Sequence, residues 1–187
     1  MKSEREKMLA GEPYVAADPE LAALNMRAQT LLHAFNASPP AAFEERRELI
    51  RQLFGAAGVN CEVKQPFFCD YGAHIRAGDN LFINYDCVIL DCNVVTLGHN
   101  VMLGPKVQIY TAHHSLDPEV RRTLVEMASP VHIGDDVWVG GGAIICPGVT
   151  VGAGSAIGAG SVVTRDIPPR MLAAGNPCRV IRELPPP

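Results

Sequence analysis

Two adjacent histidines, His113 and His114, are the residues of this chain best suited to acid–base chemistry. They lie in a polar segment, residues 111–130, whose sequence is TAHHSLDPEVRRTLVEMASP. A neutral imidazole has a pKa of about 6.5, so it can accept a proton from a hydroxyl group around neutral pH. Histidines on loops are more often ordinary solvated side chains. The residues alone therefore leave two alternatives, a general base and an exposed polar pair.

Other side chains that could bind a metal or act as nucleophiles show no recognisable spacing. Three histidines converging on one ion would make a zinc site, and the candidates are His74, His99, His113, His114 and His132. The cysteines form no CxxC pair and no zinc-like pattern; they are Cys61, Cys69, Cys87, Cys92, Cys146 and Cys178. The N-terminus, MKSEREKMLAGEPY, lacks the apolar stretch of a secretory signal. We therefore expect a cytoplasmic protein that requires no metal and whose thiols are reduced and packed as small apolar groups.

A repeat of six residues, from Val131 to Val163, indicates the scaffold that must position this segment. Every sixth residue is aliphatic, the residue two positions before it is apolar or small, and glycine follows four of the six. Residues two apart on a strand face the same side, and glycine eases a turn. A fixed six-residue period is typical of a β-helix. The six aliphatic positions are Ile133, Val139, Ile145, Val151, Ile157 and Val163.

The same period continues upstream in a looser form. It is absent from residues 111–130 and resumes at Val131. A solenoid that loses its period and then regains it has extruded a loop, and loops on rigid scaffolds often carry function. We therefore predict that the histidine pair lies on a loop that projects from a β-helix. The upstream positions of the repeat are Ala77, Ile83, Ile89, Leu97, Leu103 and Ile109.

The two ends of the chain lack the repeat. Asp18 followed by Pro19 is typical of a helix start, and an apolar stripe continues from there to Phe35. A second helix is expected from Phe43 to about Gly55. These helices are suited to covering the open end of a coil. The predicted organisation is a helical cap over residues 1–57, a parallel β-helix over residues 58–168 with its loop at 111–130, and a C-terminal tail over residues 169–187.

Composition argues against two classes of function. The formal net charge of −4 is unsuited to a nucleic-acid-binding surface. Residues 137–164 carry no charge, which a hydropathy window would read as a membrane helix. Their glycines and six-residue period identify them instead as the wall of a solenoid. We therefore expect neither nucleic acid nor a membrane as a partner.

Several longer stretches carry a more specific pattern: MLAGEPYVAADPEL, FFCDYG, CVILD, IYTAHHSLDPEVR and AAGNPCRVIRE, together with the repeat itself. They resemble the maltose and galactoside O-acetyltransferases of the hexapeptide-repeat acyltransferase superfamily, over nearly the whole chain. The resemblance implies a mainly β fold, a left-handed parallel β-helix, assembled as a homotrimer with active sites between subunits. It also implies transfer of an acetyl group from acetyl-CoA to a sugar hydroxyl.

The resemblance implies roles for residues on the donor side. His114 matches the general base, with Ser115 where the family commonly has proline, so the loop is less stiff. The backbone N–H of Gly141 matches a donor to the oxyanion of the tetrahedral intermediate, and Ala159 matches a position beside the pantetheine arm of acetyl-CoA. The residues that match the nucleotide end are Thr164, Arg165, Arg179 and Arg182. Arginine suits phosphate through its charge and its fork of donors.

On the acceptor side, the resemblance matches Asn84, Asp18, Arg27 and Asp70 to substrate contacts. From the residues alone, Asp18 could be only a helix cap and Arg27 only a solvated side chain. Asp70 stands where galactoside enzymes carry serine, and Cys92 stands where they carry a sugar-binding carboxylate. Both departures favour the maltose-type branch, with a maltose- or glucose-like acceptor.

Three other functions remain open from the sequence. The first is acetyl transfer to another acceptor, such as an antibiotic or a lipo-oligosaccharide. The second is a zinc lyase of the carbonic anhydrase type on the same scaffold, although the histidine spacing differs from that family's. The third is a non-catalytic solenoid used only for assembly, which would leave the loop histidine and the basic tail without a role.

Overall fold

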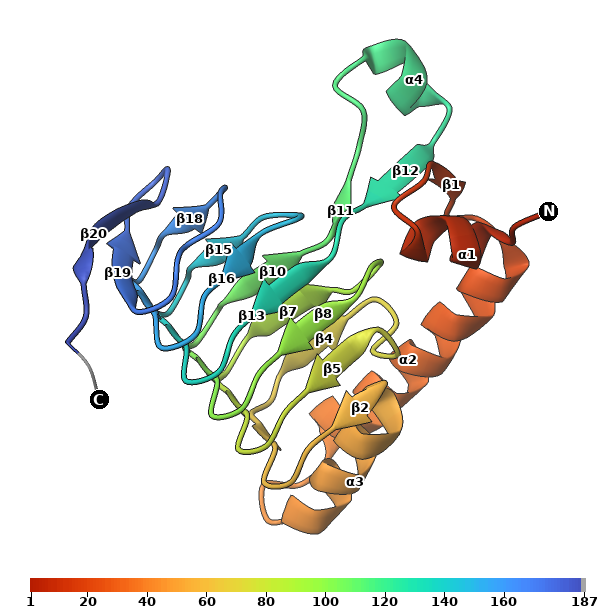
Figure 1. Ribbon diagram of the computed structural model, residues 1–187. Helices are drawn as coiled ribbons and strands as arrows, with labels where there is room; N and C mark the ends of the chain where they lie inside the picture. Colours follow the sequence, from red (N-terminus) through yellow and green to blue (C-terminus); the bar gives the residue numbers. More distant parts are fainter. Residues whose placement is uncertain (186–187) are drawn as a thin grey trace.

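The chain winds into a coil whose three faces are sheets of mainly parallel strands, and a helical cap lies at one end (Figure 1). The structure is a computed structural model that describes residues 1–185. Successive strands of the chain lie in successive sheets, which is the topology of a β-helix. The predicted fold class, a left-handed parallel β-helix with an N-terminal helical cap and an extruded loop, is confirmed.

The strands of the coil are short and stack in register. The first sheet contains β2 (Ala56–Ala57), β5 (Ile75–Ala77), β8 (Val95–Leu97), β13 (Val131–Ile133) and β16 (Thr150–Val151). The second contains β3 (Glu62–Val63), β6 (Phe82–Ile83), β9 (Met102–Leu103), β14 (Trp138–Val139), β17 (Ala156–Ile157), β19 (Met171–Ala174) and β20 (Arg179–Glu183). The third contains β4 (Phe67–Cys69), β7 (Cys87–Leu90), β10 (Gln108–Tyr110), β15 (Ile144–Ile145) and β18 (Val162–Val163).

The repeat positions form the core, as the six-residue period predicts. The six aliphatic residues from Ile133 to Val163 are all buried, and so are the small or apolar residues two positions before them. The two serines among these are satisfied within the coil. The Ser155 hydroxyl donates to Pro168 O at 2.9 Å, and the Ser161 hydroxyl donates to Gly158 O at 2.5 Å. Polar side chains are therefore tolerated inside the coil where a backbone carbonyl accepts their proton.

The coil continues across the loop without a shift in register. Leu97 pairs with Ile133, and Ile109 pairs with Ile145, although residues 111–130 separate the two coils in sequence. The loop contains β11 (Ala112–His113), α4 (Pro118–Arg122) and β12 (Val125–Ala128), and α4 lies at the tip, away from the coil (Figure 1). The prediction of a projecting loop is therefore confirmed.

The loop is joined to the N-terminal cap by a small sheet that the sequence did not predict. β12 pairs antiparallel with β11 and with β1 (Tyr14–Val15). The Tyr14 hydroxyl also donates to Glu126 Oε2 at 2.8 Å. These strands of two to four residues are too short to show an alternating pattern.

The cap consists of α1 (Glu4–Leu9), α2 (Pro19–Ala37) and α3 (Phe43–Leu53). The helices that the sequence predicts correspond to α2 and α3, whereas α1 was not expected. It begins with a capping box in which Ser3 and Glu6 bond each other's backbone N–H groups. α2 and α3 lie across the lower end of the coil (Figure 1), and Phe35 and Leu53 belong to the same buried cluster as Phe67. The cap therefore closes the core at that end.

The segment after residue 168 does not leave the coil at once. β19 pairs in parallel with β17, and β20 then turns back antiparallel along β19. All residues of β20 are exposed. Within residues 1–185 no helix combines the length and the hydropathy needed to cross a membrane.

Candidate active site

One corner of the coil, between the second and third sheets, carries Asn84 in one column of stacked residues and Gly141 and Ala159 in the adjacent column. Ile83, Leu103, Val139 and Ile157 are aligned across the second sheet, so the residues that follow them stack at its edge. Asn84 N donates to Leu103 O at 3.0 Å, and Gly160 N donates to Gly141 O at 2.9 Å. The three predicted residues therefore lie at the same corner of the coil, with Asn84 stacked on Gly104 and with Gly141 and Ala159 one residue further along their turns.

Gly141 lies close to the backbone of the preceding turn of the coil. A Cβ added there would lie 3.1 Å from Pro105 O, closer than most real contacts. The next residue, Gly142, has a φ of +69° and donates its N–H to Pro105 O at 2.8 Å. In the described part of the chain the Gly141 N–H has no hydrogen-bond acceptor. This corner thus offers an unhindered backbone donor to a ligand lying along it.

The two loop histidines differ in their surroundings. His113 is half-buried on β11, opposite Met127 of β12, and its Nε2 lies 3.3 Å from Ser129 Oγ. His114 follows the strand and is exposed. The imidazole of His113 is therefore engaged at the base of the loop, whereas that of His114 is accessible from solvent.

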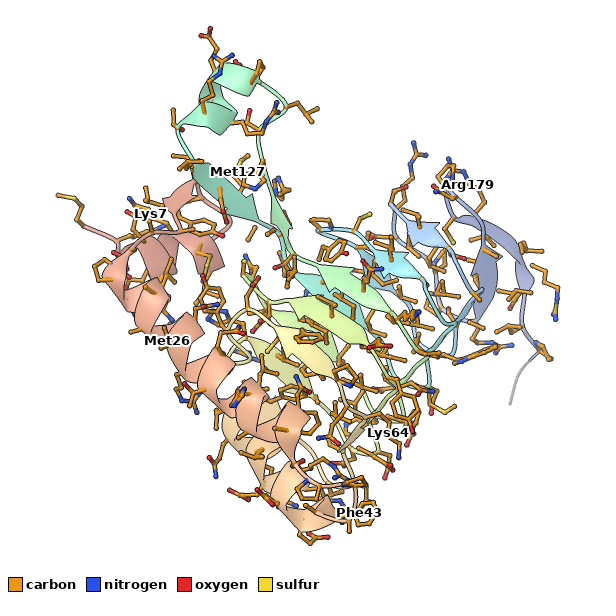
Figure 2. The ribbon with its side chains drawn as sticks, turned by 180° about the vertical axis from the view of Figure 1, so that it is seen from behind. Lys7, Met26, Phe43, Lys64, Met127 and Arg179 are labelled. Carbon is orange, nitrogen blue, oxygen red and sulfur yellow. The ribbon has the colours of Figure 1, made fainter. Side chains whose placement is uncertain are left out.

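A single chain does not bring His114 and Gly141 together. β10 leads from the corner at Pro105 to the start of the loop at Thr111, across the width of the third sheet. At roughly 3.3 Å per residue this width is on the order of 15–20 Å. The loop then turns towards the cap: Met127, which pairs with His113, lies near Lys7 of α1 in Figure 2, and Arg179 of β20 lies at the far side of the molecule. The predicted base and the predicted oxyanion donor therefore occupy opposite edges of one sheet.

Asp70 lies near the base of the loop, in a cluster of polar groups. The Cys92 thiol donates to Asp70 Oδ2 at 3.3 Å. Burial raises the pKa of the Asp70 carboxyl above its usual range, the thiol bond opposes this rise, and the charges of Asp91 and Glu126 add to it. The pKa of the Cys92 thiol is itself raised, first by burial and then by the charge of Asp70. Cys92 is therefore a neutral hydrogen-bond donor and a poor nucleophile.

Asp91 is a site residue that sequence reasoning missed. It is fully buried, and its carboxylate accepts hydrogen bonds from the backbone N–H groups of Asp70 (3.1 Å), Tyr71 (2.9 Å) and His74 (3.2 Å). It therefore fixes the turn that presents the Asp70 side chain. A carboxylate directly after the apolar strand CVIL, at the point where the coil turns its corner, was the signal available in the sequence.

Asp18 and Arg27 both have structural partners in the cap. Asp18 is the N-cap of α2, and its Oδ1 accepts from the N–H groups of Glu20 (2.9 Å) and Leu21 (3.4 Å). The exposed Arg27 guanidinium donates to Gln52 O and so connects α2 with α3. The helix-cap role that the sequence left open for Asp18 is therefore present, whereas the link from Arg27 to Gln52 was not predicted. These hydrogen bonds leave the exposed atoms of both side chains free to contact a ligand.

The residues predicted for the nucleotide end of the cofactor divide between two edges. Arg179 pairs with Ala174, which lies at the C-terminal end of the corner that carries Asn84, Gly141 and Ala159. Arg182 lies farther along β20. Thr164 and Arg165 follow β18 at the opposite edge of the third sheet, beside the origin of the loop. Between residues 1 and 185, the three arginines make no ion pair with a carboxylate, so their charge is available to an anion.

A hollow of about 550 Å³ lies elsewhere, between the cap and the first turns of the coil. Phe43, Arg46 and Lys64 are among the residues that line it, and no predicted site residue does. In the part of the chain that the structure describes, no three His, Cys, Asp or Glu side chains are grouped so as to hold a metal ion. The predicted residues thus line exposed edges of the coil rather than an enclosed pocket of one chain.

Comparison with known proteins identifies the two parts of this architecture separately. Residues 7–58 match the family model described as "Maltose acetyltransferase hexapeptide capping motif". Residues 130–165 match "Bacterial transferase hexapeptide (six repeats)". The cap and the repeat of this chain are therefore both found in known acetyltransferases.

Individual relatives match over nearly their whole length. Nodulation protein L of Rhizobium meliloti is 48% identical, over 96% of this chain and 98% of that protein. The crystal structure of a maltose O-acetyltransferase from Clostridium difficile 630 is 49% identical, with a TM-score of 0.98 and 99% of both chains covered. A galactoside acetyltransferase in complex with coenzyme A is 39% identical, with a TM-score of 0.96 over 99% of this chain and 92% of that one. The chain therefore belongs to the maltose and galactoside O-acetyltransferase family of hexapeptide-repeat proteins and is an acetyl-CoA-dependent O-acetyltransferase.

Proposed function

We propose that this enzyme transfers an acetyl group from acetyl-CoA to a hydroxyl of a maltose- or glucose-like sugar, by direct transfer with His114 as general base. The observation that carries this proposal is the different state of the two loop imidazoles. His113 is held by Ser129 at 3.3 Å, whereas His114 is exposed at the base of the projecting loop. An accessible imidazole is what proton abstraction from an incoming hydroxyl requires.

The reaction proceeds through one tetrahedral intermediate. The His114 imidazole removes the proton of the acceptor hydroxyl, and the resulting alkoxide attacks the thioester carbonyl of acetyl-CoA. The Gly141 N–H donates to the oxyanion that forms. The carbon–sulfur bond then breaks, and the imidazolium returns its proton to the sulfur of CoA. No covalent intermediate with the enzyme is needed, so both substrates bind at the same time.

The active unit in this proposal is a cytoplasmic homotrimer without a metal ion, with each site shared by two subunits. The separation of His114 from Gly141 within one chain supports this, because a second copy has to supply the missing half. The outer faces of the coil support it too. Met102 and Trp138, 48% and 53% exposed, face outward from the second sheet, and Phe68, 47% exposed, faces outward from the third.

The first sheet has the opposite character. Apart from Ala56 at the cap end, its outward positions are polar, namely Arg76, Thr96, His132 and Thr150. Apolar residues gather on two of three faces, which suits packing of those faces against neighbours while the third remains in water. Leu116 and Leu124, exposed in the loop, add apolar surface where the loop would reach over an adjacent subunit. This arrangement would bring His114 to the Gly141 corner of that neighbour.

The acceptor would bind between the cap and the base of the loop, where Asp70, Asp18 and Arg27 are placed, with Asn84 contributed from a neighbouring corner. Asp70 supplies a carboxyl group where galactoside enzymes have serine, and Cys92 supplies a neutral hydrogen-bond donor where they have a carboxylate. This exchange changes which sugar hydroxyls are recognised, and it supports a maltose-like rather than a galactoside-like acceptor.

A thiol-release assay with acetyl-CoA tests the reaction and ranks the acceptors together. The panel consists of maltose, glucosides, galactosides, chitin oligomers and hydroxylated antibiotics. We expect thiol release to be fastest with maltose or glucosides and at least tenfold slower with galactosides, a difference of about 1.4 kcal/mol in transition-state binding. Faster turnover of chitin oligomers or antibiotics would overturn the sugar assignment while retaining the acetyl transfer.

The basic C-terminal strand is expected to bind the phosphates of acetyl-CoA. Replacing both Arg179 and Arg182 by alanine should raise the KM for acetyl-CoA about tenfold and leave kcat nearly unchanged, because the lost charge-assisted bonds are far from the reacting carbonyl. Steady-state kinetics at fixed ionic strength measures both constants. Arg51→Ala, which removes an exposed arginine of α3, is the matched control. An unchanged KM in the double variant would place the phosphates elsewhere.

A further inference from the structure

We infer that Thr111 and Asn93 act together as a positioning clamp that fixes the loop carrying His114. The inference rests on the proposed role of His114 as general base. Both residues are buried, Thr111 at 0% and Asn93 at 3% exposure. They lie where the loop leaves the coil, and neither reaches the surface on which the substrates would bind. They are therefore positioning residues and not catalytic ones.

Thr111 joins the first stem of the loop to the coil. Its hydroxyl donates to Leu90 O at 2.7 Å, and its backbone N–H donates to the same carbonyl at 3.1 Å. The hydroxyl oxygen in turn accepts from Asn93 N at 2.9 Å. Thr111 O accepts from Ser129 N at 2.9 Å, which ties the second stem to the first. The Thr111 hydroxyl thus donates one hydrogen bond and accepts another, both with residues of the coil.

Asn93 joins the second stem of the loop to the cap. Its amide nitrogen donates to Ala128 O at 3.1 Å in the loop and to Met8 O at 3.0 Å at the end of α1. A longer contact of 3.4 Å reaches Leu9 O. Its amide oxygen accepts from Val94 N at 2.7 Å. Both the nitrogen and the oxygen of the amide are therefore engaged, and together they hold three segments at one point.

The clamp lies only a few residues from His114, the proposed general base. His114 is three positions beyond Thr111, and its strand neighbour His113 is paired to Met127, next to Ala128. The loop beyond this point has no buried residue: every side chain from Ala112 to Met127 is half-buried or exposed. Apart from the small sheet of β1, β11 and β12 and the packing of Ala112, no core contact holds the loop, so the buried bonds where it leaves the coil contribute directly to the direction of His114.

The test compares Thr111→Val, which keeps the shape and removes the hydroxyl, with Thr111→Ser, which keeps the hydroxyl. We expect Thr111→Val to lower kcat about tenfold with little change in the KM for acetyl-CoA, and Thr111→Ser to restore most of the loss. Amide hydrogen exchange of residues 112–127 should be faster in the valine variant and near normal in the serine variant. Ser155→Ala, which removes a buried hydroxyl elsewhere in the coil, should change neither kcat nor exchange in the loop.

A double-mutant cycle with His114→Ala separates positioning from general destabilisation. If the clamp acts through His114, Thr111→Val causes no further loss in the His114→Ala background. An equal fold-loss in both backgrounds, or unchanged exchange of the loop, would overturn the inference. If Thr111→Val does not fold, Asn93→Ala replaces it in the same cycle. Full activity of His114→Ala alone would instead refute the proposed base, and hydrogen exchange would still decide whether the clamp holds the loop.

Discussion

Replacing His114 by alanine is expected to lower kcat by about 10²–10⁴-fold, the usual contribution of a positioned general base. The acceptor hydroxyl would then lose its proton only to water, while acetyl-CoA would still bind. The KM for acetyl-CoA should therefore stay within about threefold of the wild-type value. Steady-state thiol release measures both, and gel filtration checks that the assembly is unchanged, because the side chain is exposed.

His113→Ala is the matched control for this experiment. It removes the adjacent imidazole together with its contact to Ser129, which lies at the base of the loop. We expect a loss of less than about tenfold, since this imidazole is engaged and does not face the substrate. A kcat of His114→Ala close to the wild-type value, or a larger loss of kcat in His113→Ala, would refute the assignment of the general base.

Two inactive variants are expected to complement each other when they share one trimer. His114→Ala removes the base contributed by one subunit, and Asn84→Ala removes the acceptor contact contributed by its neighbour. In a statistical mixture of equal amounts, about a quarter of the interfaces combine an intact His114 with an intact Asn84. The mixture should therefore recover about a quarter of the wild-type rate.

The measurement requires subunits that have exchanged. The two variants, carrying different tags, are unfolded together in urea, refolded and purified through both tags, which removes the trimers of a single variant and raises the expected recovery from about a quarter to about a third of the wild-type rate. Mixing the folded variants without unfolding provides the control and should give no gain. If the refolded mixture is no more active than the average of the two variants, His114 and Asn84 act within one subunit, and the shared site is wrong.

Most of the fold could be predicted from the six-residue period. It identified the inward residues from Ile133 to Val163, and it marked residues 111–130 as an insertion because the pattern stopped and resumed. It also placed Asn84, Gly141 and Ala159 at one corner of the coil, since Asn84 directly follows a strand of the second sheet and the other two lie two residues beyond aligned strands of that sheet. A periodic sequence makes register readable, because one slip would expose a whole row of apolar side chains.

The contacts between distant segments were not predictable in the same way. Asn93 bonds to Met8 across 85 positions, and Tyr14 bonds to Glu126 across 112. The small sheet that unites β1, β11 and β12 depends on such contacts rather than on any local pattern. The role of Asp91 was not predictable from the sequence either. Its partners are backbone N–H groups, which every residue except proline possesses, so no residue type marks them. The roles of Asn93, Thr111 and Asp91 therefore emerged only from the folded chain.

The direct pairing of Leu97 with Ile133 has a consequence for how such enzymes diversify. The coil closes across the loop as if the intervening residues were absent, so the core places no constraint on the loop's length. Lengthening a flexible loop is thermodynamically inexpensive, roughly 0.6 kcal/mol for each doubling. Loops of different length and composition can therefore be exchanged on this scaffold while its interior stays the same. The segment that carries the proposed base can thus vary, or be replaced by grafting, while the proposed acceptor contacts Asp70, Asp18 and Arg27 remain on the coil and the cap.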